Sequence, residues 1–421
     1  MKKIIFTLVC ITFITTISGY SQWTVYQTNT TMQLNKIQFV NENTGFAAGG
    51  GPFSDSAVFY KTINAGLNWN KFKIFDSVAY PLDEVYGLFF LNANTGFVSG
   101  RYLYIYKTTN GGANWKGYEP PYYSLTQIYN ALYFIDENTG YAAGRYGYFC
   151  KTTNGGLNWI LTADLPSNLF GVYFTSLNTG YVCAQDGAVY KTTNGGYNFV
   201  QTYIGPYSFG SIRFISENIG FVAGSDAWYY SGIYRTTNSG SNWVNILECN
   251  YELYDVFFID ANTGFSSGYQ TFLKTTNSGQ NWLTYSAPFQ GLSMYFFNSS
   301  NGYVSGGGGK IHKTTTGGVW INQISSEIPE SFEINKCYPN PFNSELKVEL
   351  AVNKILYKNP ETYLEIFDTK GTVIFKKQLQ INSPGFYEVK LDFGNLSSGI
   401  YFIRARNDNL FTQIIKVIFI K

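Results

Sequence analysis

The sequence predicts an all-β protein, in which a seven-bladed β-propeller is followed by a small antiparallel β-sandwich. Aromatic residues make up 19% of the 421 residues and 43 glycines supply turns, whereas charged residues reach only 13%. Seven copies of one unit fill the middle of the chain, at intervals from 38 residues (Trp282 to Trp320) to 46 residues (Trp69 to Trp115). Each unit holds four short apolar runs separated by turn residues, which is the size and pattern of one propeller blade.

The chain begins with a targeting segment. Lys2 and Lys3 precede an apolar run over residues 4–17, and small residues follow over 18–21. This order is typical of a secretory signal peptide, which we place at residues 1–21. The apolar run of about 14 residues is shorter than the roughly 20 that a transmembrane helix needs, so we expect no transmembrane segment after signal cleavage.

The charge and composition of the remaining chain exclude several classes of function. Of 29 basic residues, two (Lys2 and Lys3) leave with the signal, so 27 basic residues face 27 acidic ones. This balance argues against a nucleic-acid binder. A single histidine, His312, argues against histidine-based catalysis and metal sites, and we expect no catalytic residue, no metal and no cofactor. The remaining cysteines are too irregularly spaced for a disulfide framework or a zinc site; they are Cys150, Cys183, Cys249 and Cys337.

Residues 22–326 are predicted to form the propeller. Each unit contains an Asn-Thr-Gly-aromatic segment, as at residues 138–141, or a variant of it in the fifth and seventh units. Each unit ends in a box, such as Lys-Thr-Thr-Asn-Gly-Gly-Ala-Asn-Trp at residues 107–115. Asn and Gly suit a tight hairpin, and a following aromatic side chain can cover it. We therefore interpret the closing aromatics of the boxes as structural; they are Trp69, Trp115, Trp159, Phe199, Trp243, Trp282 and Trp320.

An extra copy of the fourth strand, Trp23-Thr24-Val25, stands before the first unit. A displaced strand of this kind can pair into the last blade and remove its free edge. We expect it to close the ring.

The boxes resemble the Asp-box, or bacterial neuraminidase repeat, with Asn110 where that family has Asp. Together with the Asn-Thr-Gly segments, they make residues 32–322 similar to propellers of the photosystem II assembly and stability factor family. The resemblance implies a propeller fold in which the boxes are structural.

Residues 327–421 are predicted to form a separate sandwich. Charged residues number 31 in residues 22–326 and 23 in the much shorter segment 327–421. Runs that alternate polar and apolar residues favour antiparallel strands. The segment also holds four short motifs, whose residues include Tyr338, Pro339, Asn340, Pro341, Phe342, Asn343, Gly371, Gly399 and Tyr401.

These motifs, in this order and over residues 331–421, closely resemble the type A C-terminal sorting domain of the type IX secretion system. The resemblance implies that the type IX machinery is a partner of this domain. It also implies passage through the outer membrane of a Gram-negative bacterium after export by the Sec signal. The product is then secreted or attached to the cell surface, with the sorting domain either cleaved or retained.

Two functions remain open for the propeller. The first is a binding or scaffold module that recognises a glycan or a protein. Strand reversal places the near-identical turns and boxes on one face and the variable loops on the other, so we expect a ligand on the variable face. The candidate residues there are Arg101, Arg145, Trp228, Tyr229 and Tyr230.

The alternative is a sialidase-like or other glycoside hydrolase, since sialidases also use boxed propellers. Such a site needs clustered arginines, or two carboxylates about 5–10 Å apart. The propeller has Arg101, Arg145, Arg213 and Arg235 without a recognisable motif, which makes an enzyme the weaker hypothesis. His312 occupies a slot that Tyr106 or Tyr190 holds in other units, and we expect it to be packed.

Overall fold

The protein is described here by a computed structural model. It covers residues 23–51, 57–74, 82–101, 104–120, 127–226, 228, 230–318, 321–325, 331–343, 345–353, 362–379, 381, 384–392, 396–407 and 410–420. The expected signal peptide lies outside these residues. The chain divides into two compact units, Ser21–Val319 and Trp320–Lys421, and each is treated by itself.

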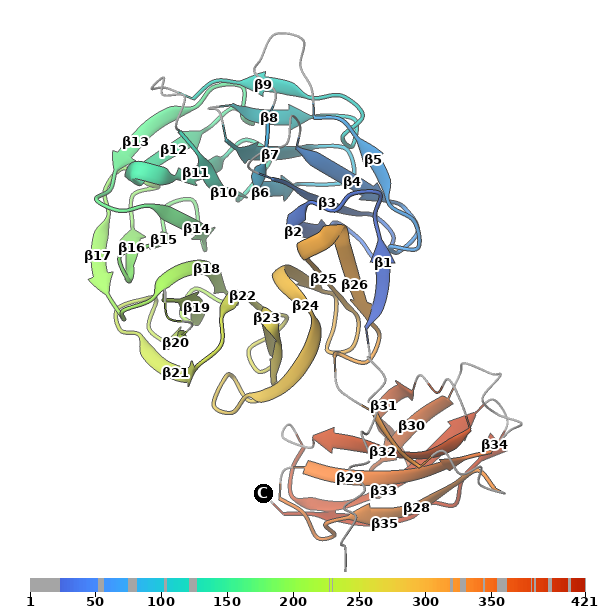
Figure 1. Ribbon diagram of the computed structural model, residues 1–421. Helices are drawn as coiled ribbons and strands as arrows, with labels where there is room; N and C mark the ends of the chain where they lie inside the picture. Colours follow the sequence, from blue (N-terminus) through green and yellow to red (C-terminus); the bar gives the residue numbers. More distant parts are fainter. Residues whose placement is uncertain are drawn as a thin grey trace, which may run out of the picture. The chain divides into compact units, whose positions relative to one another are not determined.

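The described part of the first unit forms seven blades around a ring, as predicted (Figure 1). In each blade the strands are antiparallel and follow the chain from the ring centre to the rim. Blades one to five are separate four-stranded sheets. Their strands are β2 Gln33–Phe39, β3 Gly45–Gly50, β4 Val58–Thr62 and β5 Asn70–Phe72; β6 Val85–Phe90, β7 Gly96–Gly100, β8 Ile105–Thr108 and β9 Lys116–Tyr118; β10 Tyr129–Phe134, β11 Gly140–Gly144, β12 Tyr148–Thr152 and β13 Ile160–Asp164; β14 Leu169–Phe174, β15 Gly180–Ala184, β16 Ala188–Thr192 and β17 Val200–Tyr203; β18 Ser208–Phe214, β19 Gly220–Ser225, β20 Ser231–Thr236 and β21 Val244–Cys249.

Blades six and seven share one sheet, in the order β22-β23-β24-β25-β26-β1. Two long strands join what are separate strands elsewhere. The strand β23 supplies the second and third strands of blade six, and β24 supplies its fourth strand and the first of blade seven. The bounds are β22 Leu253–Phe258, β23 Gly264–Thr275, β24 Leu283–Phe296, β25 Gly302–Gly306 and β26 Lys310–Thr314, with short 3₁₀ turns η1 Arg145–Gly147 and η2 Gly307–Gly309.

The displaced N-terminal strand closes the ring, as expected. The strand β1 (Thr24–Gln27) pairs antiparallel with β26 and completes blade seven. Trp23, just before it, is buried, and its ring meets those of Phe272 and Phe289 edge-on at 5.0 and 4.9 Å between centroids. Segments far apart in sequence therefore share one blade.

The structure differs from the expected boundary between residues 326 and 327. The strand β27 (Ile321–Ser325) follows the seventh box, within the residues that we assigned to the propeller. It pairs instead with β32 (Gly385–Asp392) in the C-terminal unit. The physical reason is that β1 and β27 cannot both pair with the outer edge of β26. Because β1 already occupies the outer edge of β26, the next segment of the chain has no pairing site left in blade seven.

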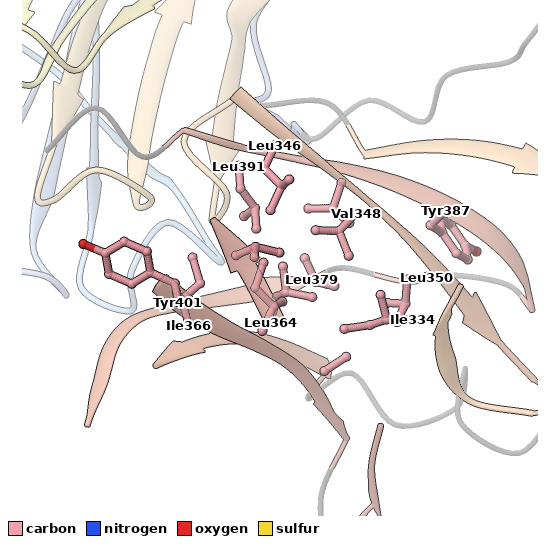
Figure 2. Packing of buried hydrophobic residues seen from close by; sticks show 14 of the residues in the cluster. Ile334, Leu346, Val348, Leu350, Leu364, Ile366, Leu379, Tyr387, Leu391 and Tyr401 are labelled. Carbon is pink, nitrogen blue, oxygen red and sulfur yellow. The ribbon is translucent and has the colours of Figure 1, made fainter. Parts of the chain in front are cut away.

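The C-terminal unit is a sandwich of two sheets, as predicted. Leu346, Val348 and Leu350 from one sheet pack against Leu364 and Ile366 from the other (Figure 2). One sheet has the order β27-β32-β29-β28, and the other has β31-β30-β33-β34 with β35 beside β33. The remaining bounds are β28 Glu333–Tyr338, β29 Glu345–Val352, β30 Thr362–Phe367, β31 Val373–Leu379, β33 Gly399–Asn407, β34 Leu410–Phe411 and β35 Ile415–Phe419.

The Pro-Asn-Pro-Phe-Asn motif at residues 339–343 holds the C-terminal strand. The Asn340 side chain accepts a hydrogen bond from Ile418 N–H at 2.9 Å and donates one to Lys416 O at 3.0 Å. The Phe342 main chain bonds to residues 418 and 420, and its ring lies 5.2 Å from that of Phe419. The motif thus fixes β35 to the rest of the domain.

Among the described residues, no helix has the length and apolar character needed to cross a bilayer.

Candidate ligand-binding face

Alternating strand directions give the propeller two distinct faces. One carries the Asn-Thr-Gly turns and the boxes, and we call it the box face. The other carries the hairpins between second and third strands and the connections between blades, and we call it the hairpin face. The two faces use their side chains in different ways.

On the box face, each hairpin is closed by its own Thr and Asn side chains. In the second unit, Thr108 Oγ1 donates to Asn110 Oδ1 at 3.0 Å and accepts from Gly112 N–H at 2.9 Å. Asn110 Oδ1 also accepts from Asn114 N–H at 2.9 Å. Only the oxygen of Asn110 is used in these bonds, so an aspartate could take the same role. The same bonds recur in the boxes whose first threonine is Thr62, Thr152, Thr192, Thr236 or Thr275.

The closing tryptophans of the boxes pack edge-on against one phenylalanine of their own blade. Trp115 meets Phe90, the last residue of the first strand, at 6.1 Å and 87°. Trp115 and Trp159 are 5% exposed, whereas Trp69, Trp243 and Trp282 are half-buried, as is Phe199. Trp320 lies outside the described residues. Equivalent pairs are Trp69–Phe39, Trp159–Phe134, Trp243–Phe214 and Trp282–Phe258, at 5.9–6.0 Å and 84–86°.

The box lysines join each blade to the next. Lys107 Nζ donates to the carbonyl oxygen of Gly155, in the following box, at 2.7 Å, and burial lowers the pKa of Lys107. Lys313 in blade seven donates to Ala65 in blade one at 3.0 Å, across the closure of the ring. The other bonds of this kind are Lys61–Ala93, Lys151–Gly195, Lys191–Ser239 and Lys274–Ser299. In the fifth unit Arg235 replaces the lysine and lies over the Phe221 ring.

The Asn-Thr-Gly-aromatic segments also join neighbouring blades. Tyr141 of blade three stacks on Phe174 of blade four, with ring centroids 3.5 Å apart. A Cβ atom on Gly140 would lie 2.4 Å from the Phe134 ring, so only glycine fits there. Corresponding stacks occur at all seven joints, at 3.5–4.2 Å. The box face is therefore used to hold the ring together.

On the hairpin face, Trp228 is 79% exposed and Tyr230 is 56% exposed. They sit at the tip between β19 and β20, where Asp226 Oδ1 accepts from the backbone N–H of both, at 2.8 and 2.9 Å. The backbone that displays them is thus fixed, although their rings face solvent. Tyr229 lies outside the described residues.

The two candidate arginines occupy tips of neighbouring blades. Arg101 forms a strand bridge with Ile128, and Arg145 N–H donates to Ile128 O at 2.9 Å. The guanidinium of Arg101 lies 4.0 Å from the Glu84 carboxylate, whereas Arg145 is exposed. Trp228 belongs to blade five, two blades beyond Arg145. The backbones of both arginines thus adjoin Ile128, whereas the aromatic pair lies on another blade.

The remaining propeller arginines have structural surroundings. The Arg213 guanidinium lies 3.8 Å from the Phe257 ring centre, which fits a cation–π contact. Within the described part of the chain, no group of three His, Cys, Asp or Glu side chains could hold a metal ion. The four described cysteines are free thiols, and burial raises the pKa of Cys150 to about 11 and that of Cys183 to about 12.

Asp255 ties three blades together near the ring centre. Its carboxylate accepts from Ser211 Oγ of blade five at 2.7 Å and from Met294 N–H of blade seven at 2.9 Å. Burial raises the pKa of Asp255, and the positive charge of Lys36 opposes this effect. Sequence reasoning missed this residue, although an aspartate where five other first strands carry Gly, Ala or Ser, and that of blade one carries Lys36, was a visible signal.

Sequence reasoning also missed two hollows on the hairpin face. One, of about 520 Å³, is lined by Tyr146, Asn168 and Asp186 among others, between blades three and four. The other, of about 390 Å³, lies between blades six and seven beside His312. The signal for the second was the run Gly307-Gly308-Gly309, which leaves one hairpin tip without side chains.

Comparisons with known proteins confirm the two predicted resemblances. Residues 71–220 match the family model described as photosynthesis system II assembly factor YCF48. Residues 336–421 match the model described as secretion system C-terminal sorting domain. The sorting domain indicates export by type IX secretion to the cell surface or outside the cell. A search of the curated proteins found no match to the chain.

Several solved structures share the propeller fold. The structure of YCF48 bound to D1 peptide is 15% identical, covers 70% of this chain and 98% of its own, and has a TM-score of 0.56. PorZ, a type-IX secretion surface component of Porphyromonas gingivalis, is 12% identical, with coverages of 92% and 59% and a TM-score of 0.55. A GH74 enzyme from Niastella koreensis is 14% identical, with coverages of 94% and 66% and a TM-score of 0.54. At these identities the likeness shows the fold alone.

Proposed function

We propose that this propeller, which a type IX sorting domain directs out of the cell, is a binding module that recognises a glycan or a surface protein through its hairpin face. The observation that carries the proposal is the display of Trp228, 79% exposed, on a tip whose backbone is fixed by Asp226. An exposed aromatic side chain on a pre-organised loop offers large contact area at a small entropy cost.

The different side-chain contacts of the two faces support the hairpin face as the ligand-binding surface. On the box face the lysines, the Asn-Thr-Gly segments and the tryptophans are engaged in contacts within and between blades. Changes at residues held in this way weaken the ring. The hairpin tips differ from blade to blade, as Arg145-Tyr146-Gly147 and Gly307-Gly308-Gly309 illustrate.

A related precedent concerns another protein. One of the similar solved structures is YCF48 bound to D1 peptide, so a propeller of this fold can serve as a binding module. The GH74 likeness has comparable strength, so the fold does not choose between binding and hydrolysis. The described arginines form no cluster of the kind that a sialidase needs, which supports binding as the function.

A ligand screen with matched variants tests this proposal. The secreted chain is applied to a glycan array and to purified surface proteins, and each ligand found is titrated. Trp228→Ala and Arg145→Ala should each weaken binding, by about 1–3 kcal/mol, without unfolding the ring. Asn110→Asp on the box face should bind normally. Normal binding by both hairpin-face variants, with loss in a folded Asn110→Asp variant, would contradict the choice of face. Release of reducing sugar from a bound glycan would support the hydrolase instead.

The proposal includes the route of export. Residues 1–21 serve as the signal peptide, and the C-terminal domain is the address for the type IX machinery of a Gram-negative bacterium. Deleting residues 331–421 should leave a folded propeller in the periplasm. Surface delivery of the truncated chain would show that the domain is not the address.

A further inference from the structure

The hollow between blades six and seven has the make-up of a small ligand site. Its volume is about 390 Å³, within the range of natural ligand pockets. Three elements of the hairpin face surround it: the hairpin tip of blade six, the connection into blade seven and the hairpin tip of blade seven. Its lining residues that matter for recognition are Tyr269, Gln270, Phe289, Gln290, Lys310 and His312.

The lining of this hollow differs from that of the hollow of about 520 Å³ beside blade four, which includes Asp186. In blade four, Tyr190 Oη donates to Asp186 Oδ2 at 2.7 Å, and Gln201 Nε2 donates to the same oxygen at 3.0 Å. In blade seven, the strand register puts His312 in the place of Tyr190. Gly308 stands four residues before it, as Asp186 does before Tyr190, and a Cβ at Gly308 would meet nothing within 4 Å.

His312, which lines this hollow, carries a buried polar atom without a partner among the described residues. The residue is 2% exposed, and its Nδ1 has no hydrogen-bond partner among the residues that the structure describes. Its ring lies 4.8 Å from that of Phe289. Burial, together with the charge of Lys310, lowers the pKa of His312 to about 4, so the ring is neutral at pH 7. A buried polar atom without a partner is unfavourable, and a ligand that supplied the partner would be held there.

The other lining groups define the chemistry of such a ligand. Tyr269 is 53% exposed and Phe289 is buried at the wall, so flat apolar surface is available. Gln270 and Gln290 offer amides that bond hydroxyl groups, and the exposed Lys310 offers a positive charge. Among the described residues that line the hollow, none is Asp or Glu. Aromatic surface, amides and one cation without a carboxylate suit a sugar that carries a negative charge.

We infer that this hollow, which we call the His312 cavity, binds an acidic sugar residue of a glycan. The carboxylate of the sugar lies toward Lys310, its ring contacts the aromatic wall, and a hydroxyl group bonds to the imidazole of His312. The inference rests on the proposed function, since it gives the hairpin face a defined site and a ligand class.

The test is a calorimetric titration of the full chain with trigalacturonate and with the corresponding neutral galactose trisaccharide. The wild type should bind the acidic sugar at least tenfold more tightly than the neutral one. Lys310→Met should remove this preference by weakening only the acidic sugar about tenfold. Lys71→Met, at an exposed lysine of the first blade, is the matched control and should bind as the wild type does.

His312→Tyr separates the cavity from the rest of the face. Tyrosine is the residue that blade four carries at this register position, so the variant should fold, with an unchanged unfolding midpoint, while its larger ring fills the cavity. Binding of both sugars should then be lost. Wild-type affinity in His312→Tyr, or no affinity of the wild type for the acidic sugar, would overturn the inference. Trp228→Ala tests the proposed function separately. If it weakens glycan binding while His312→Tyr does not, the protein binds through its hairpin face but not in the His312 cavity.

Discussion

The two faces of the propeller are built from the same seven repeats, yet they differ in what their side chains contact. On the box face, Lys107 of blade two reaches the Gly155 carbonyl of blade three, and Tyr141 of blade three stacks on Phe174 of blade four. Contacts of these kinds recur around the ring. On the hairpin face, Trp228 is 79% exposed, and the tips change from Arg145-Tyr146-Gly147 to three glycines.

This difference teaches how to interpret repetition within a chain. A ring of equivalent blades presents the same joint seven times, so a side chain that forms the joint must recur in each unit. A hairpin tip that meets no neighbouring blade has no such requirement and can vary. Repeated residues therefore mark the joints of the ring, and the hairpin tips that vary from blade to blade mark the surface open to ligands.

The largest expected effect distinguishes a buried tryptophan from an exposed one. Trp115→Ala should lower the free energy of unfolding by about 3–5 kcal/mol, because it removes a buried indole that contacts Phe90 of its own blade and Phe59 of blade one. Trp228→Ala should change it by less than about 0.5 kcal/mol. Chemical denaturation of both variants measures the difference. Equal effects would mean that the faces do not differ in their role in stability.

The second effect concerns His312 on the hairpin face. The pKa of this residue is about 4 in the folded chain, below the ordinary histidine value of about 6.5. Between these two pH values the unfolded chain binds more protons, so stability is present above pH 6.5 and is lost as the pH falls through 4. The loss attributable to His312 should reach about 3 kcal/mol.

Denaturation of the wild type and of His312→Tyr between pH 7 and pH 4 measures this contribution. The variant keeps every other titrating group and should lose less stability in acid. Parallel pH profiles would show that His312 is protonated as readily in the folded chain as in the unfolded one.

A third effect tests the glycines of the Asn-Thr-Gly segments. Gly140→Ala should cost about 1–3 kcal/mol, because its Cβ would lie 2.4 Å from the Phe134 ring. Gly51→Ala is a matched control on the propeller, where the nearest atom to an added Cβ is Met32 Sδ at 3.7 Å. The two thermal midpoints should differ clearly; if they coincide, the segment adapts and the repeat of glycine has another cause.

The smallest effect tests the bonds between blades. Lys107→Met keeps most of the apolar stem and removes the hydrogen bond to Gly155 O at 2.7 Å. The half-buried bond should be worth about 1 kcal/mol. Lys71→Met, on the exposed outer strand of blade one, should be neutral. A null result for Lys107→Met would leave the aromatic stacks as the main joint between blades.

Much of the fold could be predicted from the sequence because the length and motifs of the repeat correspond to one propeller blade. The spacing of the boxes gave seven blades, and the spare strand at Trp23 gave the closure with β26. The candidate ligand-binding site was harder to predict from the sequence than the fold. The backbones of Arg101 and Arg145 both contact Ile128, but Trp228 lies on another blade. The distance between loops of different blades depends on the ring, and no local pattern encodes it.

By itself, the sequence determined the all-β class, the blade count and the sorting domain, since each follows from short-range patterns of apolar, turn and motif residues. Only the tertiary structure decided which strand pairs with the outer edge of β26 and which hairpin tips border a hollow. Because β1 fills the edge of β26, β27 (Ile321–Ser325) joins the C-terminal sheet. Because Gly308 and His312 stand where Asp186 and Tyr190 stand in blade four, an imidazole lines the hollow beside blade seven, and none of its described lining residues is Asp or Glu. Both outcomes depend on which distant residues compete for the same space, and that competition arises only once the ring has closed.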